Sequence, residues 1–354
     1  MKKFIKFPEI EQFRNVIKGV QLSYRYKGKD ENGDAIYDPS VMLPTLTFTG
    51  TCKIHGTHAA VSFDGTEIWA QARNHNVSVE HDNAGFAFFV KSNEDVFLKL
   101  FKQIDEDTKS LQDDIITIYG EWAGSNIQGG VAISGLEKMF LIFGVKITPM
   151  SAIEEESVFA YWLTDDQYKN IHSNENRIYN VHQFKTYSID IDFNYPERSQ
   201  NEIVKMTEEV EACCPVGKYF GKEGIGEGIV FCNYSNKTGR ITFKSKGMKH
   251  SSSKVKKLAE VDTEKMNSIN EFIAYTVTDS RLLQGIEYVF TQNSLEPDVK
   301  GTGAFLKWVV NDIIKEEMDT LQSNNLEPKD MTRDASTAAR IWFMKYLNKQ
   351  AGLK

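Results

Sequence analysis

Two runs of alternating apolar and polar residues, joined by a short segment with a lysine and a glycine, constrain the fold of this chain most. The first run begins at Leu46 and ends at Lys53. The second covers residues 60–70 and has Asp-Gly at its middle, which is the pattern of a β-hairpin. Between them, Gly56 lets the backbone approach a bulky group closely. We therefore expect Lys53 at a sheet edge or mouth, facing a place where a phosphate ligand could lie.

Length and composition are those of a soluble globular protein. The chain has 354 residues, enough for two domains, and is 41% hydrophobic and 26% charged. No apolar stretch approaches the roughly eighteen residues of a membrane span, and the basic start lacks the apolar core of a signal peptide. These features predict a cytoplasmic protein that does not contact a membrane. The four cysteines, none in a Cys-x-x-Cys pair, are expected to be reduced, and the histidines lack the spacing of a zinc site.

Charge restricts the class of partner. The formal net charge of −7 argues against an indiscriminate coat on DNA, but a local basic surface could still bind nucleic acid. One such segment follows residue 243. Its basic residues are Lys244, Lys246, Lys249, His250, Lys254, Lys256 and Lys257.

The pattern of side chains along the chain predicts an α+β fold in two parts. A mostly antiparallel β domain with flanking helices is expected over residues 1–255, and an all-helical domain over 256–354. Expected strands cover 115–121, 139–147, 228–233 and 240–245, with a glycine-rich loop at 124–130 and a polar loop at 27–40. One expected helix begins at Pro8. Further helices are expected over 84–104, 266–275 (capped by Asp262 or Thr263), 305–321 and 335–347. Residues 150–222 give no clear pattern.

Six short features in chain order carry candidate chemistry, although each also has a simple structural explanation. Lys53 could end a solvated strand, Glu121 could be a surface carboxylate, and Phe143 could belong to the core. Arg73 stands between the first two. Glu227, in Gly-Glu-Gly, could be a turn residue, and an exposed edge strand would also place two alternating lysines on one face. Those two lysines are Lys244 and Lys246.

Together these residues supply what covalent nucleotide transfer from ATP requires. A lysine attacks only when it is neutral, so its pKa must be lowered by burial or by nearby cations. Lys244 and Lys246 could provide those cations and also hold phosphates. Glu227 suits Mg²⁺ beside the phosphate under attack, an aromatic face can stack on the purine, and a second carboxylate can accept from the ribose hydroxyls. Positioning and charge neutralisation would supply most of the catalysis.

With these features in order, the chain resembles the covalent nucleotidyltransferases, and within them phage RNA ligases of the RNA ligase 2 type. The resemblance covers nearly the whole chain, including a segment at 275–281 that looks like that family's appended domain. The matching motifs are Lys53-Ile-His-Gly-Thr, Gly120-Glu-Trp-Ala-Gly-x-x-Ile-Gln, Phe140-Leu-Ile-Phe143, Glu227-Gly-Ile-Val and Arg240-Ile-Thr-Phe-Lys-Ser-Lys246.

The resemblance implies an ATP-grasp-like ligase domain followed by a small all-α domain, and an ATP-dependent RNA ligase. Lys53 would take AMP from ATP, the AMP would pass to an RNA 5′-phosphate, and a 3′-hydroxyl end would then displace it. The implied cofactors are ATP and Mg²⁺, with Mn²⁺ as an alternative, and the implied protein is a monomer. The implied ATP-binding residues are Ile54, Arg73 (phosphate or RNA), Glu121 (ribose), Phe143 (adenine), Glu227 (metal), Lys244 and Lys246 (α-phosphate).

Three departures and two alternatives accompany this hypothesis. Family members often carry an acidic residue where this chain has Cys52, Asn where it has His58, and Asp where it has Gly144. DNA ligases and capping enzymes share the core motifs, but an OB-fold typically follows the last of them. An inactive nucleic-acid-binding module is the remaining alternative.

Overall fold

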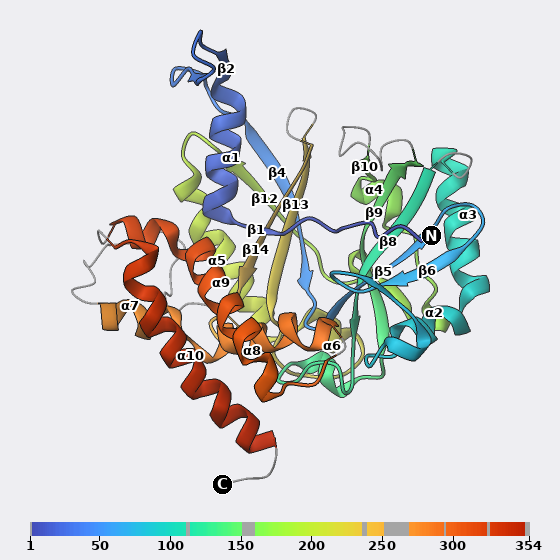
Figure 1. Ribbon diagram of the computed structural model, residues 1–354. Coiled ribbons are helices and arrows are strands. Elements are labelled where there is room, and N and C mark those ends of the chain that lie inside the picture. The colour runs from blue at the N-terminus through green and yellow to red at the C-terminus, as the bar shows by residue number, and fades with distance from the viewer. Residues whose placement is uncertain are drawn as a thin grey trace.

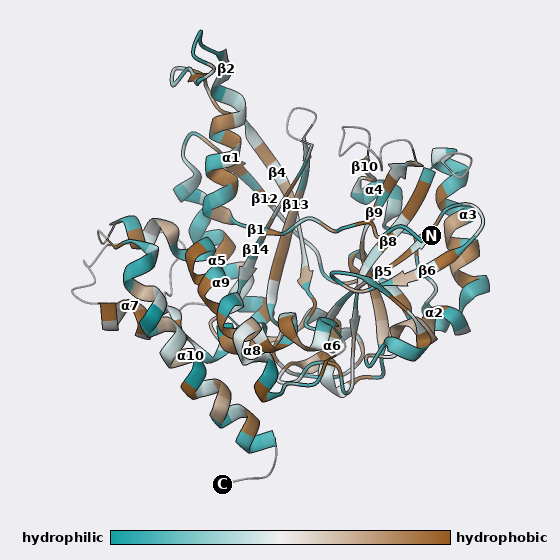
Figure 2. Cartoon of the chain, viewed as in Figure 1, coloured by the Kyte–Doolittle hydropathy of each residue, from teal (hydrophilic) through white to brown (hydrophobic). Residues whose placement is uncertain are grey.

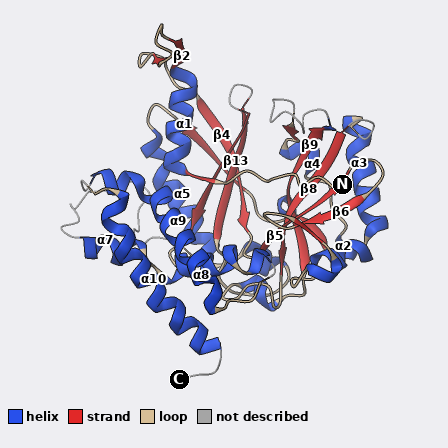
Figure 3. Ribbon diagram, in the orientation of Figure 1, coloured by secondary structure: helices blue, strands red, loops and turns tan. Residues whose placement is uncertain are grey.

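The computed structural model describes residues 2–110, 114–150, 160–235, 239–250, 269–293, 295–323 and 326–350. Two β-sheets stand side by side, each with helices on its outer face, and a group of helices from the C-terminal third lies against one end (Figure 1). Colouring by secondary structure separates the strand-rich part from this all-helical part (Figure 3). The α+β fold predicted from the sequence is confirmed.

The first sheet has five strands and contains the strand that ends at Lys53. Its interior strand β4 pairs with β13 on one side and β12 on the other, both antiparallel. Of the two positions expected for Lys53, an edge strand is therefore excluded, and the residue lies instead at the open end of an interior strand. The short N-terminal strand pairs in parallel with β14. In spatial order the strands are β1 (Glu11–Gln12), β14 (Gly239–Lys246), β13 (Gly228–Ser235), β4 (Thr45–Lys53) and β12 (Tyr187–Asp192).

The second sheet has seven strands and contains the predicted hairpin. Its central strands pair in antiparallel fashion, and a short strand at residues 178–180 pairs in parallel with the strand at 139–149. The main path is β10 (Tyr161–Trp162), β9 (Met139–Pro149), β8 (Asp114–Ala123), β5 (Thr57–Phe63), β6 (Ile68–Gln71) and β7 (Asn76–Val77), with β11 (Ile178–Asn180) beside β9. A separate two-stranded sheet is formed by β2 (Tyr26–Lys29) and β3 (Ala35–Tyr37).

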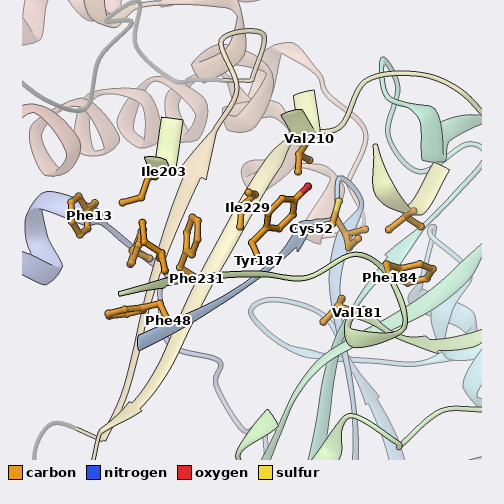
Figure 4. Packing of buried hydrophobic residues seen from close by; sticks show 14 of the residues in the cluster. Phe13, Phe48, Cys52, Val181, Phe184, Tyr187, Ile203, Val210, Ile229 and Phe231 are labelled. Carbon is orange, nitrogen blue, oxygen red and sulfur yellow. The ribbon is translucent and has the colours of Figure 1, made fainter. Parts of the chain in front are cut away.

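Amphipathic helices cover the outer face of each sheet. Phe13 of α1 (Phe13–Arg25) and Ile203 of α5 (Gln200–Ala212) pack with Phe231 of β13 in one buried cluster (Figure 4). A second cluster joins α2 (Phe86–Ser92) and α3 (Glu94–Thr108) to the seven-stranded sheet. Helices α1 and α3 show both brown and teal along their length in Figure 2, as expected for helices with one buried face. Two short helices, α4 (Asp165–Tyr168) and α6 (Pro215–Tyr219), complete this part.

The C-terminal third has its own apolar core. It contains α7 (Ile269–Thr276), α8 (Asp279–Val289), α9 (Thr302–Ser323) and α10 (Pro328–Gln350), which bury a cluster of their own. The fully buried Arg281 of α8 donates to Asp312 and Glu317 of α9, at 2.8 and 3.3 Å. These contacts fix α8 against α9.

The structure corrects several element predictions. The N-terminal helix begins at Phe13 rather than Pro8, because the two residues before it pair with β14. The polar loop contains β2 and β3, and the predicted helix 84–104 is two helices broken at Asn93, whose φ/ψ of −121°/25° is not helical. Residues 160–222, unassigned from the sequence, include β12 and α5, and helix α8 was not predicted.

The remaining strand and helix predictions are confirmed, within the residues that the structure describes. Lys254, Lys256, Lys257 and the cap at Asp262 or Thr263 lie outside those residues. No helix in the described ranges is both long enough and apolar enough to cross a membrane.

Candidate active site

Lys53 lies where the chain passes from one sheet to the other. It is the last residue of β4, and β5 of the second sheet begins only four positions later, at Thr57. Gly56 is in this crossing, and a Cβ atom there would lie 2.4 Å from the backbone oxygen of Trp122. No larger residue fits without displacing β8, so the close approach predicted for Gly56 is confirmed.

A cavity of about 1130 Å³ opens between the two sheets and extends under helices α8 and α9. All eight residues predicted from the sequence border it, although they come from four strands and three connecting segments. They are Lys53, Ile54, Arg73, Glu121, Phe143, Glu227, Lys244 and Lys246. Ile54 contributes least, since its side chain is buried in the core of the first sheet.

The carboxylate of Glu227 is at the centre of a charged cluster. Its Oε1 atom lies 2.9 Å from Nζ of Lys53 and 3.1 Å from Nζ of Lys246. Its Oε2 atom lies 3.1 Å from Nδ1 of His55. Glu227 is only 3% exposed, and although burial opposes ionisation, Lys53 and Lys246 hold the pKa of its carboxyl well below the usual range. Glu227 is therefore an ionised hub between the two lysines.

The pKa of Lys53 is shifted upward, in the direction opposite to the one that attack on a phosphate requires. Burial lowers the pKa of this amine, but Glu227 and Glu121 together raise it further, so the net shift is upward. Lys246 shows the opposite balance, because burial and the nearby Lys53 and Lys244 lower its pKa despite Glu227. Lys53 is thus held in its charged, unreactive form until the carboxylates around it are compensated.

Glu121, at the end of β8, faces the same space. Its Oε1 atom accepts a hydrogen bond from the backbone N–H of Gly56 at 3.2 Å. Burial raises the pKa of its carboxyl to about 8, with Glu287 and Glu227 adding to the shift and Lys53 opposing it. Glu121 is therefore a buried carboxyl group that favours its protonated form.

Phe143 and His58 form an aromatic part of the wall. The Phe143 ring lies 5.9 Å from the His58 ring and 5.3 Å from Phe7, over which the Arg73 guanidinium also lies, at 5.6 Å. Neither ring nitrogen of His58 has a hydrogen-bond partner among the described residues. Burial, with the Arg73 charge, lowers the pKa of His58 to about 3, so its ring is neutral and can donate or accept.

Strand β14 presents its two lysines to the cavity, as the alternation predicted, and each meets the helical part of the chain. Nζ of Lys244 lies 3.5 Å from Oε1 of Glu316 on α9. Nζ of Lys246 donates to Oε1 of Gln284 on α8, at 3.1 Å. The C-terminal helices therefore contact the residues predicted to hold phosphate.

Sequence reasoning missed His55, Gln284 and Glu287. His55 is within the Lys-x-x-Gly segment, so its closeness to Lys53 was visible, but its bond to Glu227 was not. Helix α8 does have a signal, since Leu282, Ile286 and Phe290 recur at helical spacing and are buried. Which of its polar residues would face the cavity depends on how the helix docks.

The departures from the family pattern have structural explanations. Cys52 belongs to the buried cluster of the first sheet (Figure 4), and its Sγ atom lies 3.8 Å from the backbone oxygen of Lys53. A side chain at Gly144 would place its Cβ 3.3 Å from the Trp162 ring. Neither position offers an acidic group to the cavity.

The donor set fits a small divalent cation. Glu227, Glu121 and Glu287 are carboxylates close enough to shift one another's pKa, and oxygen donors of this kind suit Mg²⁺ or Mn²⁺. Among the described residues no group of three or more such side chains has metal-binding geometry. A cation held by one carboxylate and by ligand phosphates is the arrangement that these residues allow.

Comparison with known proteins identifies the class. A model of the RNA ligase family matches residues 46–246, more than half of the chain, so the chain belongs to the RNA ligase family, whose members are covalent nucleotidyltransferases. The matched range includes every candidate residue named from the sequence. A comparison with curated proteins returned no match.

Solved structures of one protein resemble the chain at low identity. The Naegleria gruberi RNA ligase with PPi is 18% identical, with a TM-score of 0.42, over 70% of this chain and 57% of that one. A point mutant of the same ligase with AMP and Mn is 17% identical, also with a TM-score of 0.42 and the same coverage. The chain thus spans little more than half the length of these structures.

Proposed function

We propose that this protein is an ATP-dependent RNA ligase that joins 5′-phosphate and 3′-hydroxyl RNA ends through lysyl-AMP and RNA-adenylate. One observation carries the proposal. The amine nitrogens of Lys53 and Lys246 both lie within 3.1 Å of Oε1 of Glu227, in a chain of the RNA ligase family. Phe143 borders the same cavity. These groups would supply a nucleophile, a carboxylate and a phosphate-binding cation in the same cavity as an aromatic ring.

The roles follow from the chemistry of each group. Lys53 Nζ would attack the α-phosphorus, and Lys246 and Lys244 would bind the phosphate oxygens. Phe143 would stack on adenine, Glu121 would accept from the ribose, and Arg73 would contact phosphate or RNA. Ile54 would support the wall beside Lys53.

Charge compensation is the condition for the first step. Lys53 can lose its proton only when the negative charge of Glu227 and Glu121 is offset, since these carboxylates raise its pKa. Glu227 would hold the metal ion, and a divalent cation bound there supplies positive charge to the carboxylates and to the phosphate under attack. The solved Naegleria ligase structures with ATP and Mn support this choice of ligands.

The helical character of the C-terminal third favours an RNA ligase over the alternatives. Within residues 269–350, the described elements are all helical, whereas an OB-fold would add short strands. The presence of all predicted catalytic side chains around one cavity also argues against an inactive binding module.

The finer assignments are part of the same proposal. We assign the chain to the RNA ligase 2 type, with an adenylyltransferase domain at 1–255 and a helical domain at 256–354, acting as a monomer in the cytoplasm. The separate apolar core of the C-terminal helices supports the two-domain division.

The test is formation of the covalent adduct. Incubation with α-labelled ATP and Mg²⁺ should label the protein, and Lys53→Ala should abolish the label while leaving the melting temperature within about 2 °C. Lys53→Arg is the matched control, because it keeps the positive charge near Glu227 but cannot form the phosphoramidate. Labelling that survives in either variant would remove Lys53 from this role. A sealing assay with nicked RNA, single-stranded RNA and nicked DNA would then establish the substrate.

A further inference from the structure

Helix α8 brings a neutral side chain to the phosphate-binding lysine. Leu282 and Ile286 are buried in the helical core, and a Cβ atom on Gly285 would lie 2.9 Å from the Phe305 and Trp308 rings. This packing fixes the rotation of α8, so that Gln284 borders the cavity. Its Oε1 atom accepts a hydrogen bond from Nζ of Lys246 at 3.1 Å.

The contact limits the directions in which Lys246 can donate. A lysine ammonium has three N–H donors on a flexible stem, and it can rotate freely unless acceptors fix it. Glu227 and Gln284 engage two of these donors, at 3.1 Å each. Among the described residues this leaves the third for a ligand in the cavity.

The chemical type of the second acceptor matters. Glu227 already pairs with the charge of Lys246, and a carboxylate in place of Gln284 would add a second negative charge beside it. An amide oxygen fixes the direction of the ammonium without adding negative charge that would repel a phosphate. Lys246 is only 14% exposed, so water competes little for its donors.

We propose that Gln284 is a positioning residue for nucleotidyl transfer. It orients the Lys246 ammonium so that its remaining N–H points at a phosphate oxygen, which makes α8 a component of the adenylation site. This inference rests on the proposed ligase function and extends it, because the helical region then takes part in the first step of the reaction.

A purely structural role for Gln284 would be to dock α8 onto the ligase domain. The same helix offers a second docking contact, which does not involve Lys246. Ser280 Oγ donates to the backbone oxygen of Lys249 at 3.0 Å, one turn from Gln284 and without contact to Lys246. Ser280→Ala is therefore a matched control for the loss of one docking hydrogen bond.

The experiment measures single-turnover lysyl-AMP formation by the full-length protein over a range of ATP concentrations. Gln284→Ala should lower the rate at saturating ATP about tenfold, with a smaller change in the half-saturating concentration. Gln284→Glu should instead raise the half-saturating concentration, because its carboxylate competes with phosphate for Lys246. Ser280→Ala should stay within about twofold of wild type in both quantities, and all variants should melt close to wild type.

The outcomes separate this inference from the function on which it rests. If wild type forms no adduct, both are wrong. If wild type is active and Gln284→Ala matches either wild type or Ser280→Ala, only the positioning role is wrong. If Gln284→Ala loses activity and its melting temperature also falls clearly below that of wild type, the positioning role is likewise wrong, because unfolding then explains the lower rate.

Discussion

The pKa of Glu121 is raised mainly by burial, and the neighbouring carboxylates Glu287 and Glu227 add to the shift while Lys53 opposes it. The pKa of Glu121 is raised to about 8, while the same carboxyl titrates near 4.5 in an ordinary environment. The folded protein therefore holds this proton more tightly than the unfolded chain does between these two values. The stabilising contribution is fully present below about pH 4.5 and is lost as the pH rises through about 8.

A pH series of melting temperatures tests this balance. The melting temperature of the ligand-free wild type should fall between about pH 5 and about pH 9, and Glu121→Gln should reduce that fall, because the amide carries no charge at any of these values. The exposed Glu175→Gln is the control and should follow wild type. If the melting temperature falls equally with pH in Glu121→Gln and in wild type, the pKa of Glu121 is not raised in the folded protein.

At the scale of elements, two features position the site. One is the crossing of the chain from β4 to β5, and the other is the alternation of side chains along β14. Lys53 ends one sheet, and Lys244 and Lys246 face the cavity from a strand two places away, across β13. Helix α9 approaches this strand with Glu316, 3.5 Å from Lys244. A phosphate that binds Lys244 would therefore compete with the Glu316 carboxylate for this amine.

This pairing predicts a gain of affinity when it is removed. Glu316→Gln should lower the half-saturating ATP concentration for adduct formation about two- to fivefold, since Lys244 is partly exposed and its ion pair is partly screened. Lys244→Ala should raise that concentration. In the double variant, Glu316→Gln should confer no gain, because its partner is gone. A gain that persists without Lys244 would place the effect of Glu316 elsewhere.

At the scale of the whole molecule, the cavity couples two separate cores. The sheets and the C-terminal helices each bury their own apolar cluster, yet both border the cavity, through Glu227 on one side and Gln284 and Glu287 on the other. A ligand that fills this space should therefore stabilise both parts together.

Calorimetry on Lys53→Ala tests the coupling, because this variant should bind ATP without reacting. Saturating ATP and Mg²⁺ should raise the melting temperatures of both parts. At an ATP concentration one hundred times Kd, the expected stabilisation is about 2.7 kcal/mol. Gln284→Ala in the same background should weaken the shift of the helical part. If only the sheet-containing part shifts with ATP, the helices do not belong to the nucleotide site.

The sequence by itself determined the strands that carry the chemistry. Side-chain alternation is local, so β4, β8, β9, β13 and β14 and the facing of Lys244 and Lys246 could be predicted from it. The close approach at Gly56 was predictable for the same reason, since only glycine lacks a Cβ. All eight candidate residues predicted from the sequence do border one cavity.

Only the tertiary structure decided the electrostatic state of Lys53 and the contribution of α8. The pKa of Lys53 depends on carboxylates that are 68 and 174 positions away in the chain (Glu121 and Glu227, from 121 − 53 and 227 − 53), and no local pattern sets those distances. Gln284 reaches Lys246 because the packing of α8 on α9 sets its rotation. Long-range packing, rather than any motif, thus determines the directions in which the pKa values of Lys53 and Lys246 shift and which side chains contact Lys246.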